Sequence, residues 1–255
     1  MPRFASYPSL RGRVVLVSGG GSGIGASIVE HFAGQGARVG FVDVDEPASR
    51  ALVDRIGAAG HPLPLFLPCD VRDIAAYQEA IAQVAAAFGP VTVLINNAAR
   101  DDRHVLADVT PAFWDERIAV NLRHQYFAIQ AVASGMKNAG GGSIVNFSSV
   151  SYHTMTPQLS VYQAAKAAVI GMTRGLARDL GPDGIRLNAI TPGWIMTQRQ
   201  IDLWLTPEAE AALMTAQCLK EKVYPPDIAR MALWLAADDS RLVTAQNFVV
   251  DGGRM

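Results

Sequence analysis

The sequence predicts an α/β protein with a parallel, doubly wound sheet between two layers of helices. Three observations predict it. Short apolar runs alternate with stretches of helical periodicity, a glycine-rich turn joins the first run to the first such stretch, and polar residues follow the ends of later runs. Such alternation favours a parallel sheet that binds ligands at the carboxyl ends of its strands. We expect strands near residues 13–18, 38–43, 63–69, 91–96, 143–148, 184–190 and 246–250.

The first predicted strand runs directly into a glycine-rich turn, residues 19–25, which reads Gly-Gly-Gly-Ser-Gly-Ile-Gly. Apolar residues then recur at helical spacing up to Gly36, so the turn lies between a strand and a helix N-terminus. Backbone without Cβ atoms can approach a pyrophosphate closely, and the positive end of the helix dipole favours an anion. A tight turn that needs left-handed glycines would look the same by itself. The placement between strand and helix favours a dinucleotide site.

The second predicted strand ends in Asp43, close to the separation from the glycines at which a carboxylate meets the adenosine ribose. Its two oxygens can accept hydrogen bonds from the 2′- and 3′-hydroxyls, whereas the 2′-phosphate of NADP would meet a like charge. Asp43 therefore predicts NAD rather than NADP as the cofactor. The alternative is a carboxylate that only caps the helix near Pro47.

The later strands also end in polar or small residues, at the edge of the sheet where ligands bind. Asp70 follows the third strand, Asn96 to Ala99 end the fourth, Ser148 and Ser149 end the fifth, and Pro192-Gly193 follow the sixth. These chain segments should therefore meet at one site.

Tyr162 and Lys166 are four residues apart, so a helix places the phenol and the ammonium side by side on one face. A free tyrosine titrates at about 10, and a neighbouring ammonium favours its phenolate and lowers that value. This pair can therefore act as an acid and base near neutral pH. A plain surface helix is the alternative for such a pair taken alone.

Composition supports one soluble enzyme domain over the whole chain, residues 1–255. The 255 residues carry 22 basic and 23 acidic side chains, so no global field recruits nucleic acid or a membrane surface. No linker-like tract divides the chain, no apolar run reaches transmembrane length, and the first ten residues lack the apolar core of a signal peptide. We expect a cytoplasmic protein that has neither a nucleic-acid nor a membrane partner.

Neither the cysteines nor the histidines predict a disulfide or a metal site. Cys69 and Cys218 are too few for a disulfide scaffold, and we expect both to be reduced and structural. The five histidines form no ligand-spaced motif. We therefore expect no metal.

The chain resembles the short-chain dehydrogenase/reductase family over nearly its whole length. Ser18 to Gly25 resembles the cofactor motif of the family, Cys69-Asp70-Val71 its adenine-side turn, Asn96 to Ala99 its NNAG motif with alanine in the last place, and Pro192 to Thr197 its PGxxxT segment. The resemblance implies a single-domain Rossmann fold and oxidoreductase activity. It implies cofactor contacts from Gly19, Gly21, Ser22, Gly23, Ile24, Asp43, Asp70, Val71, Asn97, Ala98, Tyr162, Lys166, Pro192, Gly193, Ile195 and Thr197.

Within this resemblance, Asn121, Ser149, Tyr162 and Lys166 align with the catalytic tetrad. Tyr162 would exchange a proton with the substrate oxygen, Lys166 would lower the pKa of that tyrosine and hold the nicotinamide ribose, and Ser149 would hydrogen-bond the reacting oxygen. Asn121 would kink its helix and hold a water in a proton path from Lys166. Judged without the family, Asn121 is an ordinary polar residue of a helix at 111–138.

Polar residues near the expected site suggest a sugar substrate. The segment 101–104 reads Asp-Asp-Arg-His, and Tyr152-His153 follow Ser149 closely. Together with residues 121–124 and 216–220, these stretches look most like bacterial aldose 1-dehydrogenases, which oxidise pentoses or 6-deoxyhexoses. The candidate substrate contacts are Asp101, His104, Ser149, His153 and Trp194. Arg103 and His104 could equally form a surface ion network or a subunit contact.

Residues 194–222 lie between two prolines and contain Trp194, Leu203, Trp204 and Met214, which predicts a helical lid over the pocket. Such a lid would exclude water from the reaction. Trp194 could stack on a sugar or only pack inside the lid.

Two other functions stay open. One is a carbonyl or 3-oxoacyl-thioester reductase of the same family, using NAD(P)H in the reverse reaction, which would more often place a basic residue near Asp43. The other is a dinucleotide-binding module without catalysis, for which we would expect an incomplete tetrad. The family also implies a homotetramer built on the helices near 111–138 and 159–181. Ala164, Ala165, Ala167 and Ala168 give the second of these a small-residue face, which could equally face the sheet within one subunit.

Overall fold

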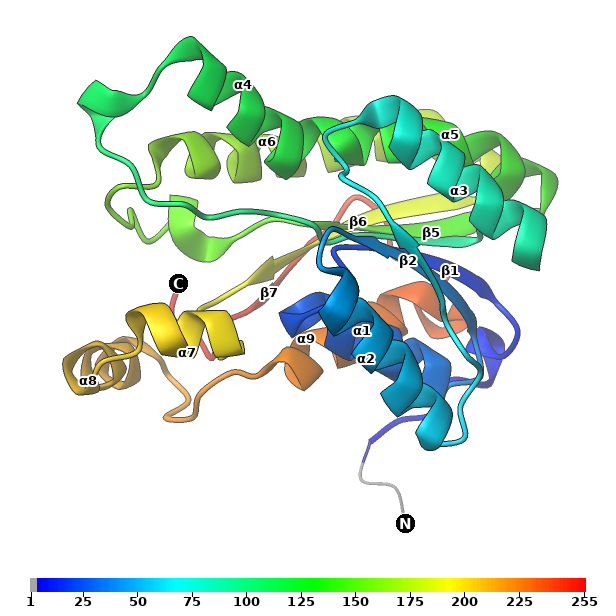
Figure 1. The fold of residues 1–255 in the computed structure, drawn as a ribbon, viewed down its shortest axis with the longest axis horizontal. Helices are drawn as coiled ribbons and strands as arrows, with labels where there is room; N and C mark the ends of the chain where they lie inside the picture. The colour runs from blue at the N-terminus through cyan, green and yellow to red at the C-terminus, as the bar shows by residue number, and fades with distance from the viewer. Residues whose placement is uncertain (1–3) are drawn as a thin grey trace.

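The computed structural model describes residues 4–255, which form one parallel sheet of seven strands. The strand order is β3-β2-β1-β4-β5-β6-β7 (Figure 1). The strands are β1 (Val14–Ser18), β2 (Arg38–Asp43), β3 (Leu65–Pro68), β4 (Val93–Asn96), β5 (Gly142–Phe147), β6 (Ile185–Pro192) and β7 (Asn247–Val250). All seven predicted strands exist, and none of their ends differs from the prediction by more than two residues. The predicted doubly wound fold is confirmed.

The direction of the chain across the sheet reverses at β1. The chain runs outward from β1 through β2 to β3, returns to pair β4 with the other edge of β1, and then runs outward to β7. Ser18 at the end of β1 is paired with Asn96 at the end of β4. In open α/β sheets, such a reversal opens a crevice at the carboxyl ends of the strands, where ligands bind.

Helices cover both faces of the sheet (Figure 1). On one face lie α1 (Gly23–Gly34), α2 (Glu46–Ala58) and α9 (Pro225–Ala236). On the other lie α3 (Ile74–Phe88), α4 (Pro111–Ile118), α5 (His124–Asn138) and α6 (Ser160–Leu180). Two shorter helices, α7 (Gln198–Trp204) and α8 (Pro207–Ala216), project beyond these layers, on the side where the C-terminus lies.

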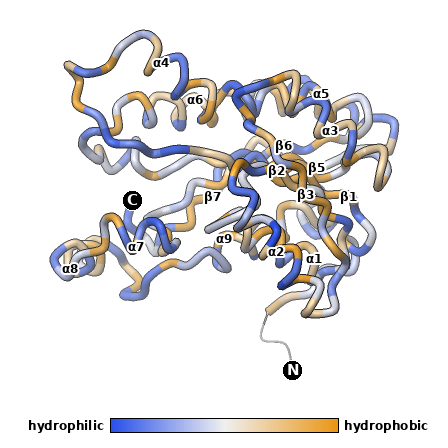
Figure 2. The backbone as a smooth tube through the Cα atoms, in the orientation of Figure 1, coloured by the Kyte–Doolittle hydropathy of each residue, from blue (hydrophilic) through white to orange (hydrophobic). Residues whose placement is uncertain are grey.

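The core consists of two apolar layers, one on each face of the sheet. Alternate side chains of a strand point to opposite faces, so Val15 and Val17 pack toward α1 and α9, whereas Val14 and Leu16 pack toward α3 and α5. The hydrophobic residues are concentrated along the central strands (Figure 2). This two-sided burial explains why the strands read as continuous apolar runs, and it leaves the strand ends as the place for polar residues.

The predicted helix at 111–138 is interrupted. It consists of α4, a π-helical turn at Ala119–Arg123 and α5. Within residues 4–255, no helix is both long and apolar enough to cross a membrane. Cys69 and Cys218 are both free thiols. The same residues contain no group of three or more His, Cys, Asp or Glu side chains arranged to hold a metal ion.

Candidate active site

A cavity of about 730 Å³ lies at the carboxyl ends of the strands, and we call it the central cavity. Its volume is typical of small-molecule and cofactor sites. It brings together nearly all the residues that the sequence assigned to cofactor and catalysis. The lining includes Gly19, Ser22, Gly23, Ile24, Asp43, Asp70, Val71, Asn97, Ala98, Ser149, Tyr162, Lys166, Pro192, Gly193, Ile195 and Thr197. Gly21 and Asn121 lie behind this wall.

Ser149, Tyr162 and Lys166 converge in the middle of the cavity. Ser149 follows β5, and the other two side chains lie one turn apart on α6. The Lys166 Nζ lies 5.6 Å from the centroid of the Tyr162 ring and donates a hydrogen bond of 2.9 Å to the carbonyl oxygen of Phe147. The Ser149 side chain lies near enough to the Tyr162 hydroxyl to lower the pKa of the phenol. A substrate oxygen placed here would meet the serine and tyrosine hydroxyls together.

The charge state of Tyr162 differs from the expectation. Burial raises the pKa of the Tyr162 phenol and the Asp101 carboxylate raises it further, while the Ser149 hydrogen bond and Arg199 lower it. In the protein alone, the pKa therefore moves in the direction opposite to the one that the Tyr-Lys pair predicts. Desolvation is the largest cause, because burial disfavours the charged phenolate.

Lys166 is 1% exposed, and burial lowers the pKa of its ammonium to about 7, although Asp101 acts in the opposite direction. Burial therefore disfavours the positive charge that Lys166 could supply beside Tyr162. A bound dinucleotide with a positively charged ring would add the charge that the protein alone does not supply at Tyr162.

Asn121 occupies the π-helical turn between α4 and α5 and is fully buried. Its Oδ1 accepts a hydrogen bond of 2.9 Å from the backbone N–H of Arg100. Its Nδ2 donates to the carbonyl oxygens of Arg100 and Arg117 at 3.0 and 2.9 Å. Asn121 thus joins the irregular turn to the chain that follows β4. The expected helix irregularity is present at this residue.

The glycine-rich turn fits a pyrophosphate. A Cβ at Gly25 would lie 1.8 Å from the carbonyl oxygen of Gly19, so the turn and α1 approach each other in a way that only glycine allows. The Ser22 side chain lines the cavity and does not cap its own helix. The first N–H groups of α1 have no partner inside the helix, and an anion can therefore accept hydrogen bonds from them.

Asp43 lies beside this turn. Its Oδ2 accepts a hydrogen bond of 2.8 Å from the backbone N–H of Gly21, and its Oδ1 accepts one of 3.0 Å from Asp45. Gly21 thus acts on the site indirectly, by fixing the Asp43 carboxylate at the cavity wall. The carboxylate keeps further lone pairs for ribose hydroxyls, because each oxygen accepts two hydrogen bonds.

Asp70 and Asn97 hold the cavity wall in different ways. Arg72 binds both oxygens of Asp70, and these hydrogen bonds are the main reason that the pKa of Asp70 is lowered. Asn97 donates from its side chain to the carbonyl oxygens of Ser18 and Gly19 at 3.1 and 2.9 Å, which ties β4 to the glycine-rich turn. Ala99 does not adopt a positive φ, so alanine in place of the family glycine imposes no strain.

The five candidate substrate contacts separate into two groups. Asp101, Ser149 and Trp194 line the cavity, whereas His104 and His153 do not. The Nε2 of His104 lies 3.1 Å from Ser160 Oγ and 3.3 Å from the backbone nitrogen of Val161, at the start of α6. The ring of His153 packs against Tyr152, with 4.0 Å between the centroids. His104 therefore holds the N-terminus of the catalytic helix.

Asp101 links the chain after β4 to the lid. Its carboxylate forms an ion pair with Arg199 and accepts a hydrogen bond of 2.9 Å from Gln200, both on α7. Gln200 in turn accepts a hydrogen bond of 2.9 Å from the indole of Trp194. Within the predicted lid at 194–222, residues up to Trp204 line the cavity, while α8 lies outside it. Trp194 packs inside the lid through this bond and still lines the cavity.

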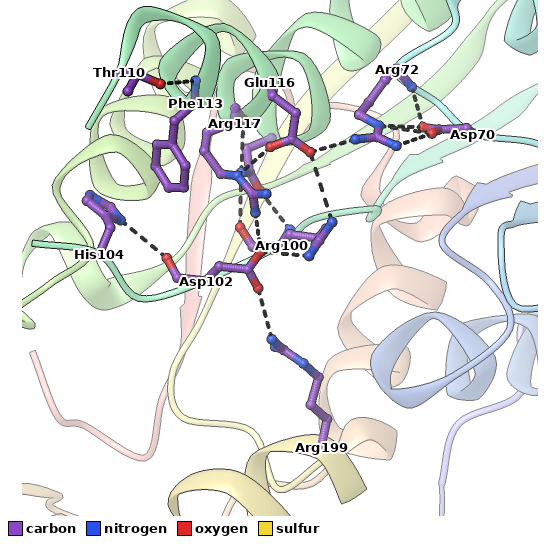
Figure 3. A network of polar contacts seen from close by, with 11 residues as sticks. Asp70, Arg72, Arg100, Asp102, His104, Thr110, Phe113, Glu116, Arg117 and Arg199 are labelled. Carbon is purple, nitrogen blue, oxygen red and sulfur yellow. Dashed lines mark hydrogen bonds and ion pairs between the residues drawn. The ribbon is translucent and has the colours of Figure 1, made fainter. Parts of the chain in front are cut away.

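A chain of ion pairs runs along the cavity wall from Asp70 to Arg199, and we call it the rim network (Figure 3). Arg72 joins Asp70 to Glu116. Further along, Asp102 forms ion pairs with Arg100, Arg117 and Arg199. Within segment 101–104, Asp101 lines the cavity and Asp102 belongs to the rim network, whereas Arg103 stacks on Trp204 and His104 contacts the start of α6. Substrate recognition by this segment stays a prediction.

Several cavity residues escaped the sequence analysis as site residues, and those with long polar or aromatic side chains on the loop after β4, α7 and the tail include Arg103, Arg199, Gln200, Trp204 and Arg254. Trp204 was noted only as part of the lid, and Arg103 as part of the polar segment 101–104 that could also form an ion network or a subunit contact. No spacing pattern marks any of them, because they reach the cavity from three segments far apart in the chain. The guanidinium of Arg103 stacks over the ring of Trp204 at 4.7 Å, which joins segment 101–104 to α7.

Comparison with known proteins supports this geometry. A family model described as Enoyl-(Acyl carrier protein) reductase matches residues 19–254. The D-xylose 1-dehydrogenase of Caulobacter vibrioides is 50% identical over 98% of both chains, and a probable galactose dehydrogenase of Rhizobium meliloti is 50% identical over 98% of this chain and 97% of that one. A crystal structure of a 3-oxoacyl-[acyl-carrier protein] reductase from Brucella melitensis superposes with a TM-score of 0.90 at 32% identity, covering 98% of this chain and 94% of that one. This chain therefore belongs to the short-chain dehydrogenase/reductase family of dinucleotide-dependent oxidoreductases.

Proposed function

We propose that the protein oxidises the C1 hydroxyl of an aldose to a lactone, with NAD as the hydride acceptor. The observation that carries this proposal is the position of Ser149, Tyr162 and Lys166 between the glycine-rich turn and a polar cavity wall. The two sugar dehydrogenases at 50% identity support the substrate class. We assign Tyr162 as the acid and base, Ser149 as the oxygen-binding group and Lys166 as the group that binds the nicotinamide ribose.

In this reaction C1 loses a hydride, which is the hydrogen with the electron pair of the C1–H bond, and the hydroxyl oxygen on C1 loses its proton. When bound, NAD would accept the hydride. Tyr162, as phenolate, takes the proton, and Ser149 hydrogen-bonds the same oxygen as it becomes a carbonyl. Buried Lys166 then returns the proton toward solvent past the π-helical turn at Asn121. Ser149, Tyr162 and Lys166 all line the central cavity.

NAD rather than NADP is proposed from the charges beside the ribose position. Asp43 presents a carboxylate where NADP would carry its 2′-phosphate. The basic side chain Arg72 also lines this part of the cavity, but its guanidinium is occupied by Asp70 and Glu116. It is therefore not free to receive a phosphate.

The activity can be tested by following NADH formation at 340 nm. The purified protein would be offered D- and L-aldoses and simple secondary alcohols, each with NAD and with NADP. We expect turnover of one stereochemical group of aldoses with NAD. No aldose turnover, but reduction of a ketone or a 3-oxoacyl thioester, would identify the reductase instead. Absence of all turnover with a bound dinucleotide would favour a module without catalysis, a reading that the intact Ser149, Tyr162 and Lys166 site disfavours.

We also propose a cytoplasmic homotetramer. The face of α6 that carries Ala164, Ala167 and Ala168 is exposed in the single chain, and so are Trp114 on α4 and Tyr126 on α5. Small residues let helices approach closely, and exposed aromatic side chains are typical of subunit contacts. Light scattering should give four times the mass of the chain. A monomer would contradict this assembly without affecting the proposed reaction.

A further inference from the structure

The C-terminal tail, residues 251–255, follows β7 and is held in a fixed turn. The Asp251 carboxylate is buried and accepts hydrogen bonds from the backbone N–H groups of Gly253 at 2.8 Å and Met255 at 2.9 Å. Gly252 and Gly253 adopt φ angles of +69° and +77°, which favour glycine. A buried carboxylate that accepts two backbone hydrogen bonds fixes the turn. The tail therefore has a defined path up to its end.

The tail is also held against the segment that follows α8. The carbonyl oxygen of Gly252 accepts a hydrogen bond of 2.9 Å from Leu219, and that of Gly253 accepts one of 3.1 Å from Cys218. A Cβ at Gly252 would lie 2.5 Å from the Gln217 side chain, so the two segments touch closely. The fixed turn and this contact present Arg254 to the central cavity.

Arg254 lines the central cavity. Two other lining guanidiniums, those of Arg199 and Arg103, are occupied: Arg199 pairs with Asp101, and Arg103 stacks on Trp204 and donates to the carbonyl oxygen of Pro157. Within residues 4–255, the Arg254 side chain has no hydrogen bond or ion pair. A partly buried guanidinium on a cavity wall is a strong donor without an acceptor.

We propose that Arg254 is a specificity-determining residue, which donates hydrogen bonds to substrate oxygens other than the one that Ser149 and Tyr162 bind. This inference rests on the proposed aldose activity. A guanidinium offers five donors in a rigid plane, which match two neighbouring acceptors. Both the vicinal hydroxyls of a neutral aldose and the carboxylate of a uronate present such acceptors, and a charged carboxylate would bind more strongly.

The test compares Arg254→Ala and Arg254→Lys with Met255→Ala, a control in the same tail whose side chain is exposed. Initial rates would be measured on D-xylose, D-galactose and D-galacturonate at saturating NAD, together with the dissociation constant for NAD and the melting temperature. We expect Arg254→Ala to raise KM for at least one of these substrates by about 10- to 100-fold, the loss typical of a hydrogen bond to a charged group. Its kcat should change by only a few-fold, and NAD binding and melting temperature should stay the same.

The substrate that loses most identifies the acceptor. A larger loss on D-galacturonate than on D-galactose means that Arg254 binds a carboxylate, and equal losses mean that it binds hydroxyls. Arg254→Lys should recover part of the loss, since it keeps the charge but not the planar pair of donors. Unchanged KM values in Arg254→Ala, with active wild-type enzyme, would overturn this inference alone. A wild-type protein that oxidises no sugar would overturn the proposed function and this inference with it.

Discussion

We call the part of the central cavity formed by the glycine-rich turn, Asp43 and Asn97 the cofactor half, and the part formed by segment 101–104 and α7 the substrate half. The cofactor half is built mainly from backbone and short side chains at strand ends, whereas the substrate half is built from long charged side chains. In the first half, Asn97 and Gly21 hold the turn and Asp43 by hydrogen bonds of about 3 Å that involve the backbone. In the second, Asp101 and Arg103 reach the cavity through contacts with α7.

The difference lies in how much each half depends on the fold alone. Backbone donors at strand ends and at a helix N-terminus are in place once the sheet has formed. Side chains that meet across a loop, a lid helix and a tail must each be ordered, which costs rotamer entropy. They also rearrange more easily than backbone groups at strand ends. Changes in the cofactor half should therefore alter one defined interaction, and changes in the substrate half should act through several residues.

The largest effect is expected where the two halves meet. Tyr162→Phe removes the only proton acceptor proposed for the substrate, so kcat should fall by about 10³-fold or more, within the usual range for a general base. NAD binding should remain nearly the same, because the other cofactor contacts are intact. Steady-state rates and NAD titration by fluorescence would measure both.

Tyr152→Phe is the matched control for this change, because Tyr152 is near Ser149 in the chain but does not line the cavity. Its kcat should stay close to that of the wild type. Turnover retained by Tyr162→Phe would remove the tyrosine from the mechanism. A comparable loss in Tyr152→Phe would mean that the local fold, rather than proton transfer, had been damaged.

The next effect tests the cofactor half by itself. Asp43→Ser removes the carboxylate proposed to bind the ribose, so KM for NAD should rise and KM for NADP should fall. We expect the preference for NAD over NADP to drop by about 10- to 100-fold, as for the loss of a hydrogen bond to a charged group. The measurement is kcat/KM with each cofactor at one sugar concentration.

Asp45→Ser is the control for Asp43→Ser. Asp45 is a neighbouring carboxylate that caps α2 by accepting a hydrogen bond from Ala48, and serine can replace it as a cap. Its cofactor preference should match that of the wild type. If Asp43→Ser keeps the wild-type preference as well, the carboxylate does not select the cofactor, and its role is limited to holding Gly21 and Asp45.

Sequence reasoning predicted the residues of the cofactor half better than those of the substrate half, because local patterns specify strand ends but not contacts between distant segments. The turn, Asp43, Ser149 and Tyr162 were predicted because parallel strands end at one edge and because helical spacing places side chains on one face. The position of Arg254 depends on a tail held by Asp251 and by the segment after α8, and no local pattern encodes that meeting.

His104 and Tyr162 show two further limits. A histidine in a polar loop after β4 suggested substrate binding, but its distance to the start of α6 depends on how that loop folds back. The neighbouring ammonium suggested a lowered pKa for Tyr162, but spacing says nothing about burial. Burial of both side chains decides the direction. Sequence gives the partners of a group more readily than its solvation.

A smaller effect is expected from Asp101→Asn, which tests whether the substrate half acts on catalysis through charge. The Asp101 carboxylate raises the pKa of Tyr162, so its removal lowers that pKa. Oxidation requires the phenolate, and the rate therefore rises with pH through the titration of Tyr162. The rising limb of the kcat profile should move to lower pH in Asp101→Asn, measured from about pH 6 to 10.

Asp115→Asn serves as the control, since Asp115 is an exposed carboxylate on α4 that does not line the cavity. Its rising limb should keep the wild-type position. A shift to higher pH in Asp101→Asn would mean that losing the ion pair with Arg199 displaces that cation from the site. In that case the position of Arg199 would affect the pKa of Tyr162 more than the charge of Asp101 does. The substrate half would then act on catalysis only by positioning Arg199.

The smallest effect concerns the contact between Arg103 and Trp204. A cation over an aromatic face is worth about 0.5–1 kcal/mol at exposed sites, so Arg103→Ala should raise KM for the sugar by about 2- to 5-fold as α7 is held less firmly. Arg50→Ala is the control, because Arg50 lies 5.8 Å over Phe66, away from the cavity. If the lid closes over the substrate, Arg103→Ala should also expose α7 to limited proteolysis and added sugar should restore protection. Equal cleavage with and without sugar would show that α7 does not move when the sugar binds. The substrate half would then be as rigid as the cofactor half, although it is built from side chains.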